Sequence, residues 1–198
     1  MNKDAPQDYK SERRLQRSAT NTQPLVSTFY QVLTRHGLTM GTIAGACLFV
    51  PISFVSSSSN FASIMSSPFY YLATLSAMLL TFIFTLSVRG HKIERTLVAW
   101  LAYLFFISVV EEFAFRLILP IFLSDTLEVT TAVFVSNLLF ACIHYVTLRW
   151  KVINCAIVFM AGLGLSRLLA NTEDMGLVIL IHFFFTFFNT PTPPKQRQ

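Results

Sequence analysis

The chain has 198 residues, of which 54% are hydrophobic and 13% are charged, and 20 of them are phenylalanines. A soluble domain cannot bury this much apolar surface, whereas helical runs of about 17 to 25 apolar residues span a membrane. The net charge of +5 comes largely from short polar segments at the ends of the apolar runs. It therefore indicates membrane topology and not a nucleic-acid-binding surface.

The order of polar and apolar segments predicts an all-α, polytopic membrane protein with about six transmembrane helices. Residues 1–24 are polar and basic and are expected to form a cytoplasmic tail. The transmembrane domain is expected over 25–190, opening with a short interfacial helix in "LVSTFYQVLTRH", and 191–198 is a short cytoplasmic tail. The six apolar runs lie at about 37–55, 69–88, 96–123, 129–147, 152–170 and 176–190.

The distribution of Lys and Arg predicts the orientation of these spans. Basic residues gather in the two tails and in the segments "RGHKIER" (89–95) and "LRWK" (148–151), and the other connecting segments, 56–68, 124–128 and 171–175, contain none. Because loops rich in Lys and Arg stay inside, both termini are expected in the cytoplasm, at a bacterial inner membrane. Arg167 departs from this pattern, and we expect it to reach the outer surface or to pair with Glu173 or Asp174.

The third run contains "VVEEFAFRLILP", in which Glu111, Glu112 and Arg116 interrupt an otherwise apolar span. Each such residue costs about 2.5 to 3.5 kcal/mol at the centre of a spanning helix, so these three must be paired or used. Glu112 precedes Arg116 by four residues, which favours an ion pair on one helix face. Glu111 points about 100° away from Glu112 and needs another partner.

Two further spans each contain one histidine, His144 in the fourth and His182 in the sixth. A single histidine inside a membrane is typically a hydrogen-bond partner between helices. A glutamate together with two histidines on three spans provides the groups needed to activate water and to stabilise an oxyanion. Gly162 and Ser166, four residues apart, indicate close packing of the fifth span against a neighbour.

These residues, in this order, resemble the family of CAAX-protease and bacteriocin-processing membrane proteins, also called abortive-infection proteins. Its EExxxR motif is similar to Glu111, Glu112 and Arg116, its FxxxH motif to Phe140 and His144, and its later histidine to His182. The similarity covers about residues 96–190. The resemblance implies an intramembrane glutamic endopeptidase without a cofactor or metal, acting on a membrane-embedded or membrane-proximal peptide or protein.

In this family the first glutamate and the FxxxH histidine activate water, and the later histidine and an asparagine four residues further on stabilise the oxyanion. By resemblance these roles fall on Glu111, His144 and His182, but Thr186 stands at the asparagine position. Asn189 lies on nearly the same helix face, about 10 Å further along the axis. Either residue could complete the oxyanion hole.

A uniform rise per residue from the ends of the spans places Glu111 and His182 at similar depths. The same count places His144 about 14 Å closer to the cytoplasm. We therefore expect either that the fourth span begins later than 129 or that the third is broken near its acidic pair, toward Pro120.

Three alternatives to the peptidase remain at this point. A non-catalytic protein of the same fold could bind a membrane partner as an immunity or scaffold protein, which the Thr186 departure favours. Two carboxylates and two histidines could also bind zinc, although no HExxH motif is present and Arg116 disfavours a cation. A proton-coupled transporter would use buried Glu and His, but no inverted repeat is apparent.

Overall fold

The computed structural model of the protein describes residue 26 and residues 28–50 and 54–194. All regular elements in this part of the chain are helical and none is a strand, which confirms the all-α prediction. In chain order the elements are α2 (Phe29–Val32), the π-helical turn η1 (Leu33–Gly37), α3 (Leu38–Cys47), α4 (Phe54–Ser66), α5 (Pro68–Val88), α6 (Arg95–Glu112), the π-helical turn η2 (Phe113–Ile118), α7 (Leu119–Ser124), α8 (Val129–Thr147), α9 (Val152–Thr172) and α10 (Met175–Asn189).

The first long helix begins earlier than predicted. The Thr28 side chain accepts a hydrogen bond from the Gln31 backbone N–H at 3.2 Å, which caps α2. From Phe29 the helix continues through η1 and α3 to Cys47 without a break. The stretch expected to be a separate interfacial helix is therefore partly the first two turns of the first long helix, which places His36 inside the bundle.

Residues 56–68, predicted to be a connecting loop, lie largely in the helix α4. This helix packs against α10, and a Cβ atom on Gly176 would lie 2.8 Å from Cγ1 of Ile64 and from Cδ1 of Tyr71. The glycine therefore gives both neighbouring helices room to approach α10. The loop prediction was wrong because it rested on the run of serines, whereas Phe61 and Ile64 provide apolar side chains that a helix brings to one face.

Three helices are long and apolar enough to cross a membrane: α5, α8 and α9. They coincide with three of the six predicted spans. The largely apolar α10 is shorter, with 15 residues. Of the other two predicted spans, the first, 37–55, is represented by α3, which ends at Cys47, and the third, 96–123, is interrupted by the π-helical turn η2.

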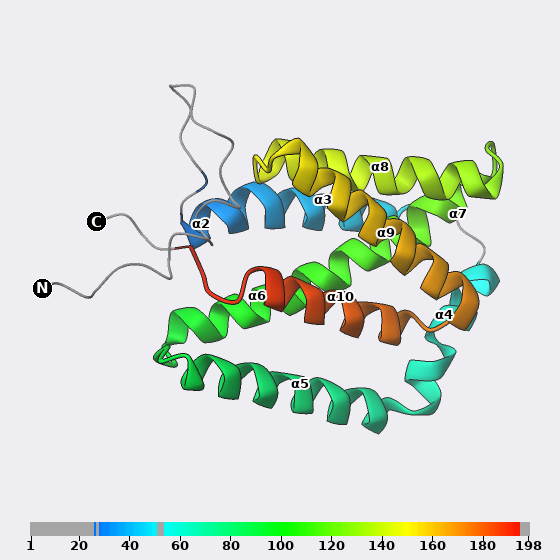
Figure 1. Ribbon diagram of the computed structural model, residues 1–198. Helices are drawn as coiled ribbons and strands as arrows, with labels where there is room; N and C mark the ends of the chain where they lie inside the picture. The colour runs from blue at the N-terminus through cyan, green and yellow to red at the C-terminus, as the bar shows by residue number, and fades with distance from the viewer. Residues whose placement is uncertain (1–25, 27, 51–53, 195–198) are drawn as a thin grey trace, which may run out of the picture.

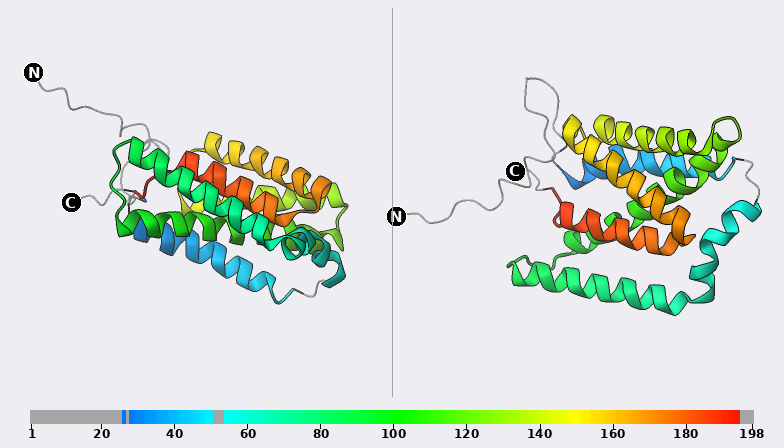
Figure 2. Two further views of the ribbon diagram at one scale, coloured as in Figure 1. Left: turned by 90° about the horizontal axis from the view of Figure 1, so that it is seen from below. Right: turned by 45° about the vertical axis from the view of Figure 1, so that its right-hand side comes forward.

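The helices run broadly along one direction, and α6 crosses the bundle obliquely (Figure 1). The α9 helix packs along α8, and α10 packs along α6. The α9 and α10 helices are joined by a short turn at one end of the bundle and diverge toward the other end (Figures 1 and 2). At that other end lie the basic connections 89–94 and 148–151, the arrangement that alternating basic loops predict.

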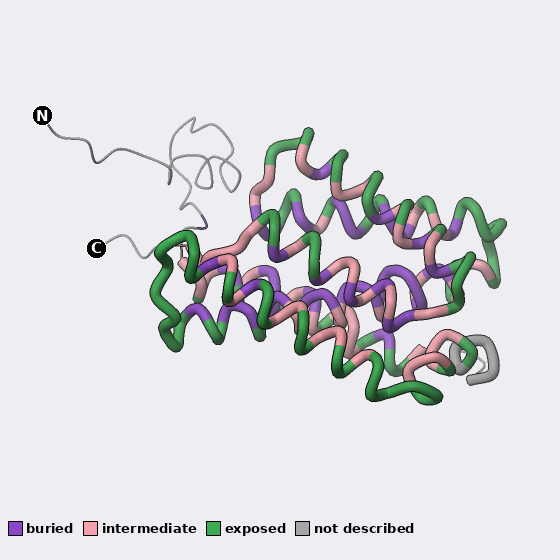
Figure 3. Tube along the Cα trace, turned by 60° about the horizontal axis from the view of Figure 1, so that its bottom comes forward, coloured by how far each residue is buried: buried purple, intermediate pink, exposed green. Residues whose placement is uncertain are grey.

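The core lies around α6 and α10, and the exposed positions lie on the outer sides of the bundle (Figure 3). The phenylalanine run at 183–188 divides accordingly. Phe183 and Phe187 are buried, and the Phe187 ring stacks on Phe82 of α5 with 3.8 Å between centroids. Phe184 and Phe185 are exposed. This packing holds α10 between α5 and α6, and so it fixes the position of His182.

Candidate active site

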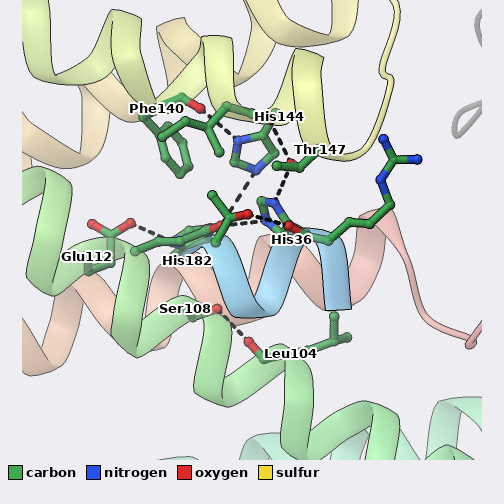
Figure 4. Close-up of polar contacts among 12 residues, drawn as sticks. His36, Leu104, Ser108, Glu112, Phe140, His144, Thr147 and His182 are labelled. Atoms are coloured by element: carbon green, nitrogen blue, oxygen red, sulfur yellow. Dashed lines mark hydrogen bonds and ion pairs between the residues drawn. The ribbon is translucent and has the colours of Figure 1, made fainter. Parts of the chain in front are cut away.

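The Glu111 carboxylate lies at the centre of a buried cluster of three histidines. Its Oε1 atom is 2.9 Å from Nε2 of His36 and 3.7 Å from Nε2 of His144, and its Oε2 atom is 3.4 Å from Nε2 of His182. Figure 4 shows the three imidazole rings converging from different elements: η1, α8 and α10. Glu111 itself is 2% exposed. The partner that the sequence required for Glu111 is therefore a set of histidines.

Glu112 faces a different set of partners, as its angular separation from Glu111 predicted. Its Oε2 atom is 3.3 Å from Nε of Arg116, an ion pair without hydrogen-bond geometry. Its Oε1 atom is 2.5 Å from Nδ1 of His182. Glu112 is completely buried, and the charge of Arg116 and the imidazole together compensate its carboxylate.

The hydrogen-bond partners of two histidines define which ring nitrogen carries a proton. Nδ1 of His144 is 2.9 Å from the Phe140 carbonyl oxygen, which can only accept, so this nitrogen donates. Nδ1 of His182 donates in the same way to the Glu112 carboxylate. In the neutral form of each ring, the lone pair is then on Nε2, which is the nitrogen that faces Glu111.

Phe140, the first residue of the FxxxH pattern, contributes more than spacing. Its carbonyl orients His144, and its ring packs on that imidazole with 4.5 Å between centroids. The same ring lies 4.0 Å from Cζ of Arg116, a cation–π contact. One buried side chain thus connects the histidine motif on α8 to the Glu–Arg motif.

The predicted close packing around Gly162 and Ser166 is present where α9 meets α8. Asn137 on α8 donates a hydrogen bond from Nδ2 to Ser166 Oγ at 2.9 Å. A Cβ atom on Gly162 would lie 2.8 Å from Nη2 of Arg116 and closer still to the Asn137 amide oxygen. Glycine is therefore needed here to make room for the arginine side chain. Asn137 had not been predicted to be part of this packing.

A cavity of about 740 Å³ leads to the cluster. At its inner end it is lined by His36, Glu111, His144 and His182. Further out it is bounded by Thr186 and Asn189 on α10 and by residues 90–92 of the connection between α5 and α6. The two residues considered for the oxyanion hole thus border the same cavity as His182.

The count of depth misplaces His144, since its Nε2 atom is 3.7 Å from Oε1 of Glu111. Of the two expectations drawn from that count, the later start of the fourth span is wrong, because α8 begins at Val129. The interruption of the third span near its acidic pair is present as the π-helical turn η2. The helices do not begin and end at the same level of the bundle. The α6 helix begins beyond the end of α8 and crosses it obliquely (Figure 1), so a count from the ends of the spans misplaces the two residues. The π-helical turn η2 follows Glu112 directly, and each residue from Ala114 to Ile118 is buried. Such turns widen a helix and occur often at functional sites.

His36 and Thr147 were not predicted to belong to the site. His36 is 3% exposed, and its Nδ1 atom is 2.8 Å from Thr147 Oγ1. The first apolar run was predicted to begin at residue 37, so the prediction left out His36 by one position. A signal was present in the sequence: Phe29, Val32, His36 and Met40 recur at helical spacing and share one face.

Three of these side chains could also hold a metal ion. His36, Glu111 and His144 each provide one ligand atom, and these three atoms lie within 4.8 Å of one another. Imidazole nitrogens and a carboxylate oxygen are ligands that zinc accepts. The zinc alternative therefore has a defined location, with His36 as an additional ligand.

Comparison with known families supports the resemblance inferred from the motifs. Residues 93–188 match the family model described as type II CAAX prenyl endopeptidase Rce1-like. This segment contains the EExxxR motif, the FxxxH motif and His182, and over these residues the chain is similar to that family of CAAX proteases. No curated protein and no solved structure matches the chain. Together with the three apolar helices, the family identifies an integral membrane protein.

Arg167, by contrast, does not take part in the site. It is exposed, and within the described part of the chain it forms no ion pair with Glu173 or Asp174. Asp174 instead accepts hydrogen bonds from Tyr71 Oη at 2.6 Å and from the Leu177 backbone N–H at 2.9 Å.

Arg116→Ala should destabilise the protein strongly. It leaves Glu112 buried beside one imidazole only, and removing one partner of a buried ion pair costs about 3 to 5 kcal/mol. The melting temperature in detergent micelles measures this loss. Arg167→Ala is the matched control. Because Arg167 is exposed, its substitution should change the free energy of unfolding by no more than about 0.5 kcal/mol. Equal melting temperatures for the two variants would contradict a structural role of the Glu112–Arg116 pair.

Proposed function

We propose that the protein is an intramembrane endopeptidase of the glutamic type, which hydrolyses a peptide bond of a membrane-associated substrate. The observation that carries the proposal is the convergence of Glu111, His144 and His182 at the inner end of a cavity. These are the residues that the family motifs select, and they come from three helices that are far apart in sequence. Proton transfer and oxyanion stabilisation need such groups within reach of one reacting carbonyl.

Water activation is assigned to Glu111 and His144. Both Oε1 of Glu111 and the Nε2 lone pair of His144 are hydrogen-bond acceptors, and they lie 3.7 Å apart. A water molecule against this pair donates a hydrogen to one of them while its oxygen attacks the carbonyl carbon of the substrate. The abstracted proton is then delivered to the amide nitrogen as the C–N bond breaks, so one water is consumed for each bond.

Oxyanion stabilisation is assigned to His182 with Thr186. Glu112 accepts the Nδ1–H of His182 and thereby stabilises the imidazolium form, as a buried carboxylate does in serine-protease triads. The imidazolium then has an Nε2–H to donate. Arg116 forms an ion pair with the other oxygen of Glu112. Thr186 lies one helical turn after His182 and borders the cavity, where its hydroxyl group supplies a second donor.

The cavity also fits the substrate class that the family description names, a peptide with a prenylated C-terminus. Most of its wall is made of apolar side chains, including Val158, Leu165 and Phe185. The outer part is bordered by His91 and Lys92, which are exposed. A lipid-modified chain terminus would place its apolar part in the cavity and its polar backbone toward these residues, on the side predicted to be cytoplasmic.

Glu111→Gln should abolish cleavage, because the amide cannot accept the proton from water. The change is nearly isosteric, so the protein should still insert and melt close to the wild-type temperature. The measurement compares the membrane peptidome of cells with wild-type protein and with the variant, and searches for a new terminus present only with the wild type. Turnover by Glu111→Gln at the wild-type rate would refute its role. A wild type that cleaves no membrane peptide would favour the non-catalytic binding protein.

Dialysis against a chelator should leave cleavage unchanged, because side chains alone carry the protons in the proposed mechanism. The activity of the purified protein is measured before and after extensive dialysis against EDTA. Loss of activity that stoichiometric zinc restores would instead assign His36, Glu111 and His144 to a metal centre that activates the water.

Thr186→Val should slow turnover by about 10²- to 10³-fold, the usual effect of deleting one oxyanion donor. Thr186→Asn should retain activity, because it restores a donor at the position where the family carries asparagine. Asn189→Ala is the matched control on the same helix. A damaging Asn189→Ala with a silent Thr186→Val would assign the second donor to Asn189, and two silent variants would exclude both residues from the oxyanion hole.

A further inference from the structure

His36 lies outside the segment that matches the family, which begins at residue 93, and none of the motifs includes it. Its side chain is nevertheless a direct neighbour of the proposed base. The Nε2 atom of His36 is 2.9 Å from Glu111 Oε1, shorter than the distance from His144 or His182 to the same carboxylate. Of the three histidines around Glu111, the one at the shortest distance therefore comes from the first helical segment.

The hydrogen bonds of Thr147 determine the role of the second imidazole nitrogen. The Thr147 hydroxyl donates to the Ile143 carbonyl oxygen at 2.7 Å, and a hydroxyl has only one hydrogen to donate. Its oxygen must therefore accept from Nδ1 of His36, at 2.8 Å. Nδ1 carries a hydrogen, and the ring is oriented by a helix other than its own.

The contact with Glu111 then requires a second hydrogen between His36 and the carboxylate. In a neutral imidazole only one nitrogen carries a hydrogen, and in His36 that nitrogen is Nδ1, which donates to Thr147. Nε2 would then have only a lone pair, and so would the Oε1 atom of an ionised Glu111 that it faces. A hydrogen bond of 2.9 Å forms when the His36–Glu111 pair holds one additional proton.

The packing around His36 keeps the ring in place. Its ring lies edge-on to His144, with 4.7 Å between centroids. The next residue, Gly37, allows the helix to approach α6 closely, since a Cβ atom there would lie 3.0 Å from Cε2 of Tyr103. The first helical segment is thus seated directly against the helix that carries Glu111.

From these contacts we infer that His36 is a positioning residue for the peptidase: anchored by Thr147, it holds Oε1 of Glu111 and leaves Oε2 facing His182. The inference rests on the proposed function, because it assigns His36 a task only through Glu111. It adds a Thr147–His36–Glu111 relay of hydrogen bonds to the groups that the family motifs provide. The relay spans α8, η1 and α6.

The kinetic test compares His36→Leu with His36→Gln in purified full-length protein. Leucine is similar in size and has no donor, so kcat should fall by about 10²-fold with KM unchanged, as expected for a misplaced catalytic group. Glutamine keeps an N–H and should retain more of kcat than leucine does. Thr147→Val should also lower kcat, because the ring loses its anchor.

Two control variants match these changes outside the relay. Tyr30→Leu replaces an exposed side chain of the same helical segment as His36 that does not line the cavity. Thr81→Val removes an exposed hydroxyl that donates to the backbone carbonyl four residues earlier. Thr147 makes the same local hydrogen bond and in addition accepts from His36. Both controls should keep the wild-type kcat. If His36→Leu has the wild-type kcat while Glu111→Gln is inactive, the inference is overturned and the proposed function stays intact.

A second measurement separates this inference from the activity. Melting temperatures are compared for His36→Gln, Glu111→Gln, the double variant and the wild type in one detergent. Two residues that share a hydrogen bond should give shifts that do not add. Additive shifts would overturn the inference even if the wild type cleaves its substrate, and non-additive shifts would support the contact even if no cleavage is found.

Discussion

A carboxylate within the hydrocarbon layer has no bulk water to solvate it, so the protein itself must supply donors and counter-charges. Here the chain places two carboxylates side by side, and each is buried almost completely. Adjacent residues point in different directions, so the two acids take partners from several elements, and His182 of α10 reaches both. The need to compensate Glu111 and Glu112 therefore brings together side chains from η1, η2, α8 and α10 at one level of the bundle.

The two acids differ in what surrounds them, and His182 connects them. Glu112 is compensated by a permanent charge, that of Arg116, whereas Glu111 faces only imidazoles, which can gain or lose a proton. His182 contacts one acid through each ring nitrogen. The two neighbouring carboxylates thus have partners of different kinds, and the proposed function assigns proton transfer to Glu111 and not to Glu112.

Features that depend on local spacing could be predicted from the sequence. The helical class, the Glu112–Arg116 pair and the separate direction of Glu111 all follow from hydropathy and from 3.6 residues per turn. Features that depend on how helices are placed relative to one another could not. The contact between Glu111 and His144 requires the oblique course of α6, and the contact between Glu112 and His182 requires the packing of α10 against that helix.

His36 illustrates a different limit of sequence analysis. Its helix begins in a segment with polar residues such as Gln31 and Thr34, which lowers its hydropathy and led to a start at residue 37. In the structure the polar residues Thr28 and Thr34 bond to the backbone of their own helix, and His36 turns inward to Glu111. The prediction from hydropathy was therefore too short, because hydropathy does not detect the local hydrogen bonds and the contact with a buried acid that stabilise the first turns of this helix.

The joined ends of α9 and α10 have a consequence for the membrane as a barrier. Among the described residues, those that line the cavity belong to neither α4, α5 nor α7, so the cavity stops at the histidine cluster. Beyond the cluster the bundle is closed by Met175 and Val178, both fully buried, and by the hydrogen bond from Tyr71 to Asp174. In the described part of the chain the cavity thus opens toward the end of the bundle that holds the connection 89–94, and water entering there would meet the acids at its inner end.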